Sequence, residues 1–86
     1  MIFKLTNHVK EEMVRRSISW TLLEQVLNNP QQIVIEKGNL NAYQSIVTFE
    51  DGRTFLIRAI VDDSITPAVV VTAYRTSKTK KYWRST

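Results

Sequence analysis

The sequence contains no cysteine, and it has only two glycines and two prolines among its 86 residues. Without cysteine the chain can form neither a disulfide framework nor a zinc site with cysteine ligands. It has one histidine and its acidic residues are scattered, so we expect no metal site built from protein side chains. Neither a glycine-rich phosphate loop nor a nucleophile motif is present. Any enzymatic activity should therefore operate without a metal ion or another cofactor.

Long apolar runs are also missing from the chain. The longest, Ala68–Val71, has four residues, whereas a membrane-spanning helix needs roughly 20. The N-terminal residues Met1–Asn7 lack the apolar stretch of a signal peptide. Together with the absence of cysteine, these features predict a cytoplasmic protein that does not contact a membrane.

Basic residues are concentrated at the C-terminal end of the chain. The net charge is +4, and residues 75–86 alone contain five lysine or arginine residues and no acid. The preceding residues hold seven basic side chains against eight acidic ones. Such asymmetry predicts an anionic partner, with nucleic acid as the first choice. A tail that only keeps the protein in solution is the alternative that charge alone leaves open.

Periodicity predicts a change from helices to strands near residue 31. Two amphipathic helices should come first, one capped by Thr6 or Asn7 and the other by Ser19. The predicted elements are helices at 7–16 and 20–28 and strands at 33–35, 42–49, 53–61 and 68–75. We therefore predict one α+β domain over residues 1–86, with two N-terminal helices packed on one face of a four-stranded antiparallel sheet. Its parts are a helical part (1–30), an antiparallel sheet (31–75) and a basic aromatic tail (76–86).

The Asp51-Gly52 pair predicts a tight hairpin with a two-residue turn. This register places Arg58 opposite Ser45, in a strand that is otherwise apolar. Arginine is seldom buried without a partner. Arg58 should therefore pair with Glu36 or with an aspartate of the 62–63 loop, or else bind phosphate on an open sheet surface.

His8 is the only histidine, and helical spacing places it on one stripe with Glu12 and Arg15. An imidazole suits general acid–base catalysis near neutral pH, and Glu12 could orient its ring. An ordinary residue at the boundary of the core is the alternative. The metal-free reaction that suits histidine, arginine, lysine and tyrosine is cleavage of RNA by its own 2′-hydroxyl. Further side chains of the right type are Tyr74, Arg75, Lys78, Lys81 and Tyr82, with Trp83 able to stack on a base.

Three stretches of the sequence resemble a bacterial family described as a domain of unknown function, number 4258. They are NHVKEEMVRRSIS at 7–19, LLEQVLNNPQQIV at 22–34 and VVVTAYRTSKTKKYW at 69–83. The family pattern has a histidine, a Met-x-x-Arg step and Gly-Ile-Ser, and Ser17 stands here where glycine is usual. At its other end the pattern closes with a Thr-x-Tyr-Arg strand end and a basic Tyr-Trp tail.

This family is similar in layout to the RelE, ParE and BrnT toxins, whose fold is shared with small metal-independent ribonucleases. The resemblance implies a RelE- or barnase-like domain and a toxin-like endoribonuclease, with RNA as substrate and a cognate antitoxin protein as partner. Two alternatives remain: a non-catalytic nucleic-acid or protein-binding module, and a ParE-like inhibitor of a protein target. The oligomeric state is not predicted. On this basis we expect catalytic roles for His8, Arg16, Arg58 and Tyr74, and RNA binding by Arg75, Lys78, Lys80, Lys81, Tyr82 and Trp83.

Overall fold

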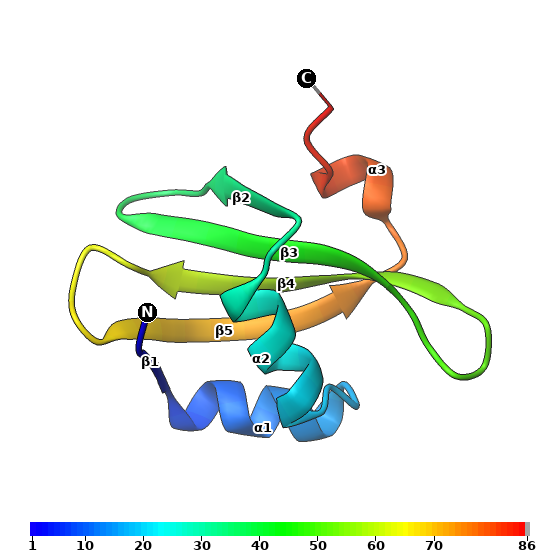
Figure 1. The fold of residues 1–86 in the computed structure, drawn as a ribbon, viewed down its shortest axis with the longest axis horizontal. Coiled ribbons are helices and arrows are strands. Elements are labelled where there is room, and N and C mark those ends of the chain that lie inside the picture. The colour runs from blue at the N-terminus through cyan, green and yellow to red at the C-terminus, as the bar shows by residue number, and fades with distance from the viewer. Residues whose placement is uncertain (86) are drawn as a thin grey trace.

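Short helices and strands follow one another along residues 1–85, the part of the chain that the computed structural model describes. The strands form one sheet, and the helices lie around it (Figure 1). None of the helices within residues 1–85 is long and apolar enough to cross a membrane. In chain order the elements are β1 (Phe3–Leu5), α1 (Asn7–Arg15), α2 (Trp20–Asn28), β2 (Gln32–Ile35), β3 (Leu40–Thr48), β4 (Thr54–Asp62), β5 (Ala68–Thr76) and α3 (Thr79–Tyr82).

The two N-terminal helices begin at the capping residues that the sequence indicates. The Thr6 hydroxyl oxygen accepts a hydrogen bond from the Val9 amide, and the Ser19 hydroxyl oxygen accepts one from the Leu22 amide, both at 3.1 Å. These bonds satisfy backbone donors that the first turn of a helix leaves without partners. The predicted helices closely match α1 and α2 because their start signals are local.

α1 ends in a left-handed turn at Ser17, whose φ angle is 53°. The Ile18 amide donates to the Met13 carbonyl at 2.9 Å, and the Ser17 amide donates to the Val14 carbonyl at 3.3 Å. These two bonds form the Schellman arrangement, which requires a positive φ angle directly after the helix cap. Glycine adopts this angle at no steric cost, and serine does not. The glycine that the family pattern has at this position therefore has a conformational reason.

The sheet has five strands of mixed direction, in the order β1-β5-β4-β3-β2. β1 runs parallel to β5 and pairs Phe3 with Ala68, whereas the other neighbouring strands are antiparallel. The prediction of a four-stranded antiparallel sheet with two helices is therefore wrong, because it omits β1 and α3. β1 has only three residues, so its strand structure depends on pairing with a segment near the other end of the chain.

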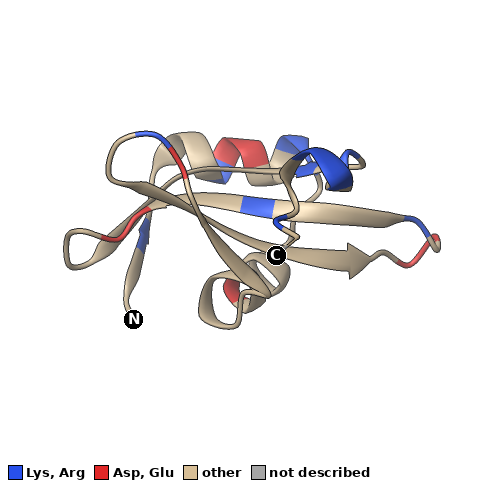
Figure 2. Ribbon diagram, turned by 90° about the horizontal axis from the view of Figure 1, so that it is seen from above, with Lys and Arg blue, Asp and Glu red and all other residues tan. Residues whose placement is uncertain are grey.

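The two N-terminal helices do not cover the same face of the sheet. α2 contacts β3 and β4, whereas α1 contacts β5, along the edge that β1 leaves open after Val70. Viewed along the sheet, α2 lies on one side, and α1 and α3 lie on the other (Figure 2). We call these two sides the α2 face and the α3 face. The prediction that both helices pack on one face is wrong for this reason.

The hydrophobic core lies on the α2 face. Leu23 and Val26 of α2 are almost completely buried there against Ile57 and Ala59 of β4. Val9 of α1 reaches the same core from the edge of β5. Removal of these apolar side chains from water holds α2 on the sheet and α1 at its edge.

The β3–β4 hairpin has a register one residue away from the predicted one. The Phe49 amide donates to the Arg53 carbonyl at 2.8 Å, so residues 50–52 form a three-residue turn instead of a two-residue turn. Gly52 supplies the positive φ angle, 84°, that such a turn requires. Arg58 consequently pairs with Gln44 and not with Ser45. A shift of one residue exchanges the faces of a strand, and here it places Arg58 on the side of the sheet away from α2.

Candidate nucleic-acid interface

Four polar side chains form a straight row across the α3 face of the sheet. Register pairs Gln32 of β2 with Gln44 of β3, Gln44 with Arg58 of β4, and Arg58 with Tyr74 of β5. Residues paired directly across strands point to the same face. Gln44 and Arg58 are 0% and 3% exposed, so the centre of this row is fully buried. We call these four residues the polar row.

Arg58 is the centre of a hydrogen-bonded network. Its Nε donates to Gln44 Oε1 at 2.8 Å, its Nη1 donates to the Tyr74 hydroxyl at 2.7 Å, and its Nη2 donates to Glu36 Oε1. The sequence left Glu36 or an aspartate of the 62–63 loop as the ion-pair partner of Arg58, and in the structure the partner is Glu36. Each of the three nitrogens of this buried guanidinium has a hydrogen-bond partner, so no desolvated charge is left unpaired.

The C-terminal segment covers the polar row. The Tyr82 ring lies over the Arg58 guanidinium, with 4.3 Å between Cζ and the ring centroid, and the Tyr82 carbonyl accepts from Gln44 Nε2 at 3.2 Å. Gln32 Oε1 accepts from the Arg84 amide at 3.1 Å, and Gln32 Nε2 donates to the Arg84 carbonyl at 2.6 Å. No residue of α3 is buried. Polar contacts and one cation–π stack therefore hold α3 in place, with little apolar burial.

Tyr74 is the member of the polar row that lies next to α1. Burial raises the pKa of its hydroxyl above the ordinary value, although the hydrogen bond from Arg58 acts in the opposite direction. The Arg16 guanidinium lies 6.0 Å from the centroid of the Tyr74 ring. Tyr74 thus connects the end of α1 with Arg58.

A stripe of ionisable side chains runs along α1 beside β5. His8 Nε2 shares a hydrogen bond with Thr72 Oγ1 at 3.2 Å and lies 4.0 Å from Glu12 Oε1. Glu12 Oε2 accepts from Arg16 Nε at 2.8 Å, and Glu12 Oε1 lies 3.3 Å from Arg15 Nη1. The hydrogen bond from Arg16 holds the pKa of Glu12 below its ordinary value, against an opposing effect of burial. The His8 side chain is 58% exposed, so its imidazole is open to a ligand.

A series of contacts links the four side chains that we predicted to be catalytic: His8 and Arg16 meet at Glu12, Arg16 lies beside the Tyr74 ring, and Tyr74 bonds Arg58. Thr72 and Tyr74 are two residues apart on β5, so both point to the same face of the sheet as Arg58. The contacts that His8 makes with Thr72 and Arg16 makes with Tyr74 therefore lie on that face. His8 and Arg16 are two helical turns apart, which is about 12 Å along α1. Both side chains nevertheless approach the Glu12 carboxylate, His8 Nε2 at 4.0 Å and Arg16 Nε at 2.8 Å, so their functional nitrogens lie closer together than their backbones.

The predicted RNA-binding residues divide between the two faces. Lys78, Lys80 and Lys81 are exposed at α3, and Figure 2 shows these cations on the same side of the sheet as the basic end of α1. Arg75 pairs with Ile57 and points to the α2 face. Its guanidinium lies 4.8 Å from the Phe49 ring centroid and is therefore separated from the α3 lysines.

Sequence reasoning missed the roles of Gln32 and Gln44. Both are uncharged residues in strands, and only the correct hairpin register shows that they line up with Arg58. The sequence indicates Glu36 as a partner for Arg58 but not as a residue that faces a pocket. The contact between His8 and Thr72 could not be predicted either, because it depends on α1 lying at the edge of β5.

A family model described as a domain of unknown function (DUF4258) matches residues 5–75. The matched part extends from the end of β1 to β5, so α3 and the segment after it lie outside the match. No curated protein and no solved structure matches the chain. Because the matched residues make up most of the sequence, the chain belongs to the DUF4258 family.

Proposed function

We propose that this protein binds single-stranded RNA along α1 and α3 and cleaves it without a metal ion, as a toxin-like endoribonuclease. One observation carries the proposal: the exposed His8 imidazole lies beside Glu12, on the side of the sheet where the cations of α3 and of the end of α1 gather (Figure 2). In this proposal the activity is held in check by a cognate antitoxin protein.

The reaction is attack of the RNA 2′-oxygen on the adjacent phosphorus. His8 takes the proton of the 2′-hydroxyl, the bond from oxygen to phosphorus forms, and the bond from phosphorus to the 5′-oxygen breaks. The products are a 2′,3′-cyclic phosphate and a 5′-hydroxyl, whose oxygen takes its proton from water, and His8 then returns the proton it holds to the solvent. The Glu12 carboxylate, 4.0 Å from Nε2, stabilises the imidazolium that forms on His8.

The cations have separate roles in this proposal. Arg16, with 41% of its side chain exposed, is able to contact RNA phosphate. Arg58 has its nitrogens bonded to Glu36, Gln44 and Tyr74, so it acts as a positioning residue that holds α3 in place. The exposed lysines of α3 bind neighbouring phosphates as point charges.

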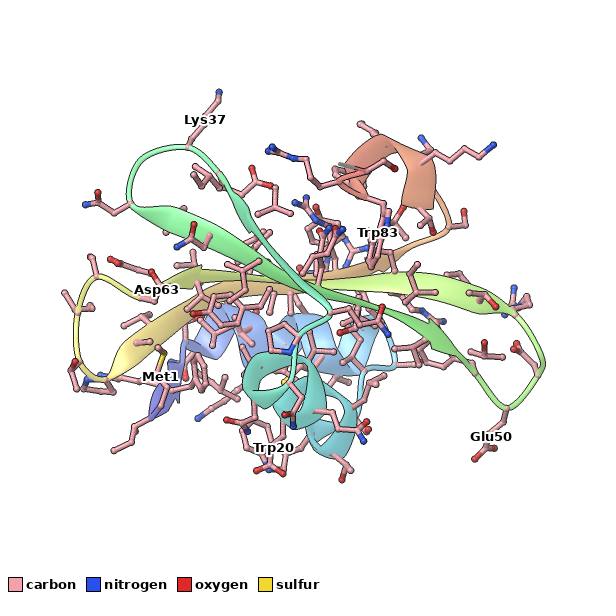
Figure 3. The ribbon with its side chains drawn as sticks, turned by 45° about the horizontal axis from the view of Figure 1, so that its top comes forward. Met1, Trp20, Lys37, Glu50, Asp63 and Trp83 are labelled. Carbon is pink, nitrogen blue, oxygen red and sulfur yellow. The ribbon has the colours of Figure 1, made fainter. Side chains whose placement is uncertain are left out.

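The test is incubation of purified protein with end-labelled RNA in the presence of EDTA, with His8→Gln as the variant. We expect the wild type to produce 2′,3′-cyclic phosphate ends. The cleavage rate of His8→Gln should be at least about 100-fold lower, as loss of an acid–base group predicts. Lys37→Ala is the matched control, because Lys37 lies at the tip of the β2–β3 turn, away from α1 (Figure 3). Equal cleavage by wild type and His8→Gln would refute the role of His8.

A non-catalytic RNA-binding module is the second candidate. It is favoured by the bonding of Arg58 and Tyr74, since two of the four side chains expected to be catalytic are engaged with other protein groups. The same incubation separates the two candidates. A wild type that binds RNA in the EDTA buffer but leaves it intact is the result that selects the binding module.

A further inference from the structure

An open pocket of about 390 Å³ lies on the α3 face, between the end of β2 and the C-terminal segment. Glu36, Lys81, Trp83 and Arg84 line it, and the buried Arg58 lies beneath them. Figure 3 shows Trp83 beside α3, above the sheet. The pocket is large enough for a nucleobase, and its described lining includes no residue of α1.

Among the described residues that line this pocket, Glu36 is the one acidic side chain. Its Oε1 accepts from Arg58 Nη2, and Arg58 is itself fixed by Gln44 and Tyr74, so the carboxylate has a defined orientation. One third of the Glu36 side chain (33%) remains exposed. A carboxylate repels phosphate, so binding of the RNA backbone by Lys81 and Arg84 does not explain a partly exposed acid in the same pocket.

A carboxylate oriented in this way selects a ligand with neighbouring N–H donors. Ionised carboxylates only accept hydrogen bonds, and their two oxygens match two parallel donors. Guanine has such a pair on one edge, its N1–H and its N2 amino group. Adenine, cytosine and uracil do not place two N–H donors side by side on that edge.

We propose that the pocket is a guanine-binding site. Glu36 accepts from guanine N1–H and N2–H, the Trp83 ring stacks on the base, and Lys81 and Arg84 bind the attached phosphate. This inference rests on the proposed function where RNA is the source of the guanine. A free guanine nucleotide would engage the same groups through the same chemistry.

Neutralisation of Arg58 is the simpler role for Glu36. Glu36→Gln separates the two roles, because the glutamine oxygen can still accept from Arg58 Nη2 whereas its amide no longer accepts two donors from guanine. If Glu36 only neutralises Arg58, the wild type and Glu36→Gln should show the same base preference. The guanine site predicts that the preference disappears in the variant.

The experiment is calorimetric titration of the full chain with GMP, AMP, CMP and UMP, and with the pentaribonucleotides UUGUU and UUAUU. We expect GMP to bind at least about tenfold more tightly than AMP, which is the usual effect of one bidentate base contact. Glu36→Gln should lose this preference. Glu50→Gln is the control, because Glu50 lies at the tip of the β3–β4 hairpin (Figure 3) and should keep the preference.

Equal binding of the four nucleotides and of both oligonucleotides by the wild type would overturn the guanine site, even where RNA is bound and cleaved. A preference for guanine without any RNA cleavage would support the site while the ribonuclease proposal fails. A preference for guanine among the mononucleotides alone would identify a free nucleotide as the ligand. A preference for UUGUU over UUAUU alone would identify RNA as the source of the base. Should Glu36→Gln not fold, NMR titration of the wild type with GMP replaces it, and absence of shifts at Glu36 and Trp83 overturns the proposal.

Discussion

The guanidinium of Arg58 connects three strands and the C-terminal segment through hydrogen bonds and a cation–π contact. It is 3% exposed and bonds Gln44 of β3, Tyr74 of β5 and Glu36 at the end of β2, while Tyr82 covers it. If the guanidinium is removed, a carboxylate, an amide and a hydroxyl lose their partner at the same time. Buried groups left in this way cost more than the bond itself contributes.

We therefore expect Arg58→Ala to lower the free energy of unfolding by about 3 kcal/mol. Urea denaturation followed by circular dichroism measures this change. The matched control is Arg53→Ala, because Arg53 pairs with Asp51 on the surface and has 68% of its side chain exposed. The control should change stability by less than about 1 kcal/mol. Equal effects of the two substitutions would contradict the structural role of Arg58.

Ser17 offers a test of the turn between α1 and α2. Its φ angle of 53° is unfavourable for a residue with a Cβ atom, so Ser17→Gly should stabilise the protein by about 1 kcal/mol. The measurement is the thermal unfolding midpoint, which should rise. Ser77→Gly is the comparison, because Ser77 is not among the residues with a positive φ angle. A lower midpoint for Ser17→Gly would show that the serine side chain contributes something the turn geometry does not explain.

Glu12 should contribute to the pH dependence of stability. Its pKa in the folded protein is lowered, first by the hydrogen bond from Arg16, so its contribution is present above the ordinary value of 4.5 and is lost as pH falls through the folded value. Glu12→Gln should therefore be less stable than the wild type at pH 7, and the difference should shrink below pH 4.5. Denaturation curves across this range measure it, and a difference independent of pH would contradict the ion-pair explanation.

At the scale of elements, local signals predicted some parts of the fold and long-range pairing decided the rest. The caps at Thr6 and Ser19 identify α1 and α2 because each acts within one helical turn. β1 and α3 have three and four residues, and contacts with distant segments hold them in place. The turn at 50–52 contains Asp51-Gly52, which suits both a two-residue and a three-residue turn, so the register was undetermined.

The candidate site divides in the same way. The nature of its residues was predictable, since a lone histidine and a basic aromatic C-terminal end are visible in the sequence. Their arrangement was not, because the position of His8 depends on α1 at the edge of β5 and that of Arg58 depends on the hairpin register. Side chains such as Gln44 carry no distinctive sequence signal, although Gln44 is fully buried at the centre of the polar row.

α3 should detach when its aromatic contact is removed. Its residues have little apolar burial, and Tyr82 supplies both the ring over Arg58 and an edge-on contact with Tyr74. In Tyr82→Ala we expect the amides of residues 79–85 to show the relaxation of a mobile segment, while those of the sheet keep their order. The heteronuclear NOE measures this change, with Lys80→Ala as a control that should stay ordered. An ordered α3 in Tyr82→Ala would contradict the role of the Tyr82 ring in holding it on the sheet.

At the scale of the whole molecule, charge separates the two faces of the sheet. The exposed lysines of α3 and the basic end of α1 lie on one side, and α2, which has no basic residue in its last turn, lies on the other (Figure 2). A partner with regularly spaced negative charges would therefore approach from the α3 face. Such an approach is faster and tighter at low ionic strength.

RNA binding should weaken with salt in proportion to the number of phosphates that the protein neutralises. For single-stranded RNA, each neutralised phosphate adds about 0.7 to the steepness of the logarithm of the binding constant against the logarithm of salt concentration. The double variant Lys80→Ala, Lys81→Ala should therefore reduce this slope by roughly 1.4. Fluorescence anisotropy with a labelled oligonucleotide measures it, and Lys37→Ala should leave the slope unchanged. An unchanged slope in the double variant would remove α3 from the interface.

The most direct test of RNA binding along α1 and α3 is NMR titration of the labelled protein with a short 2′-O-methyl RNA, which cannot be cleaved by its own hydroxyl. We predict shifts at His8, Arg16 and the segment 78–84, with the amides of α2 unaffected. Shifts confined to α2 and the β2–β3 turn, or none at all, would contradict the proposed interface.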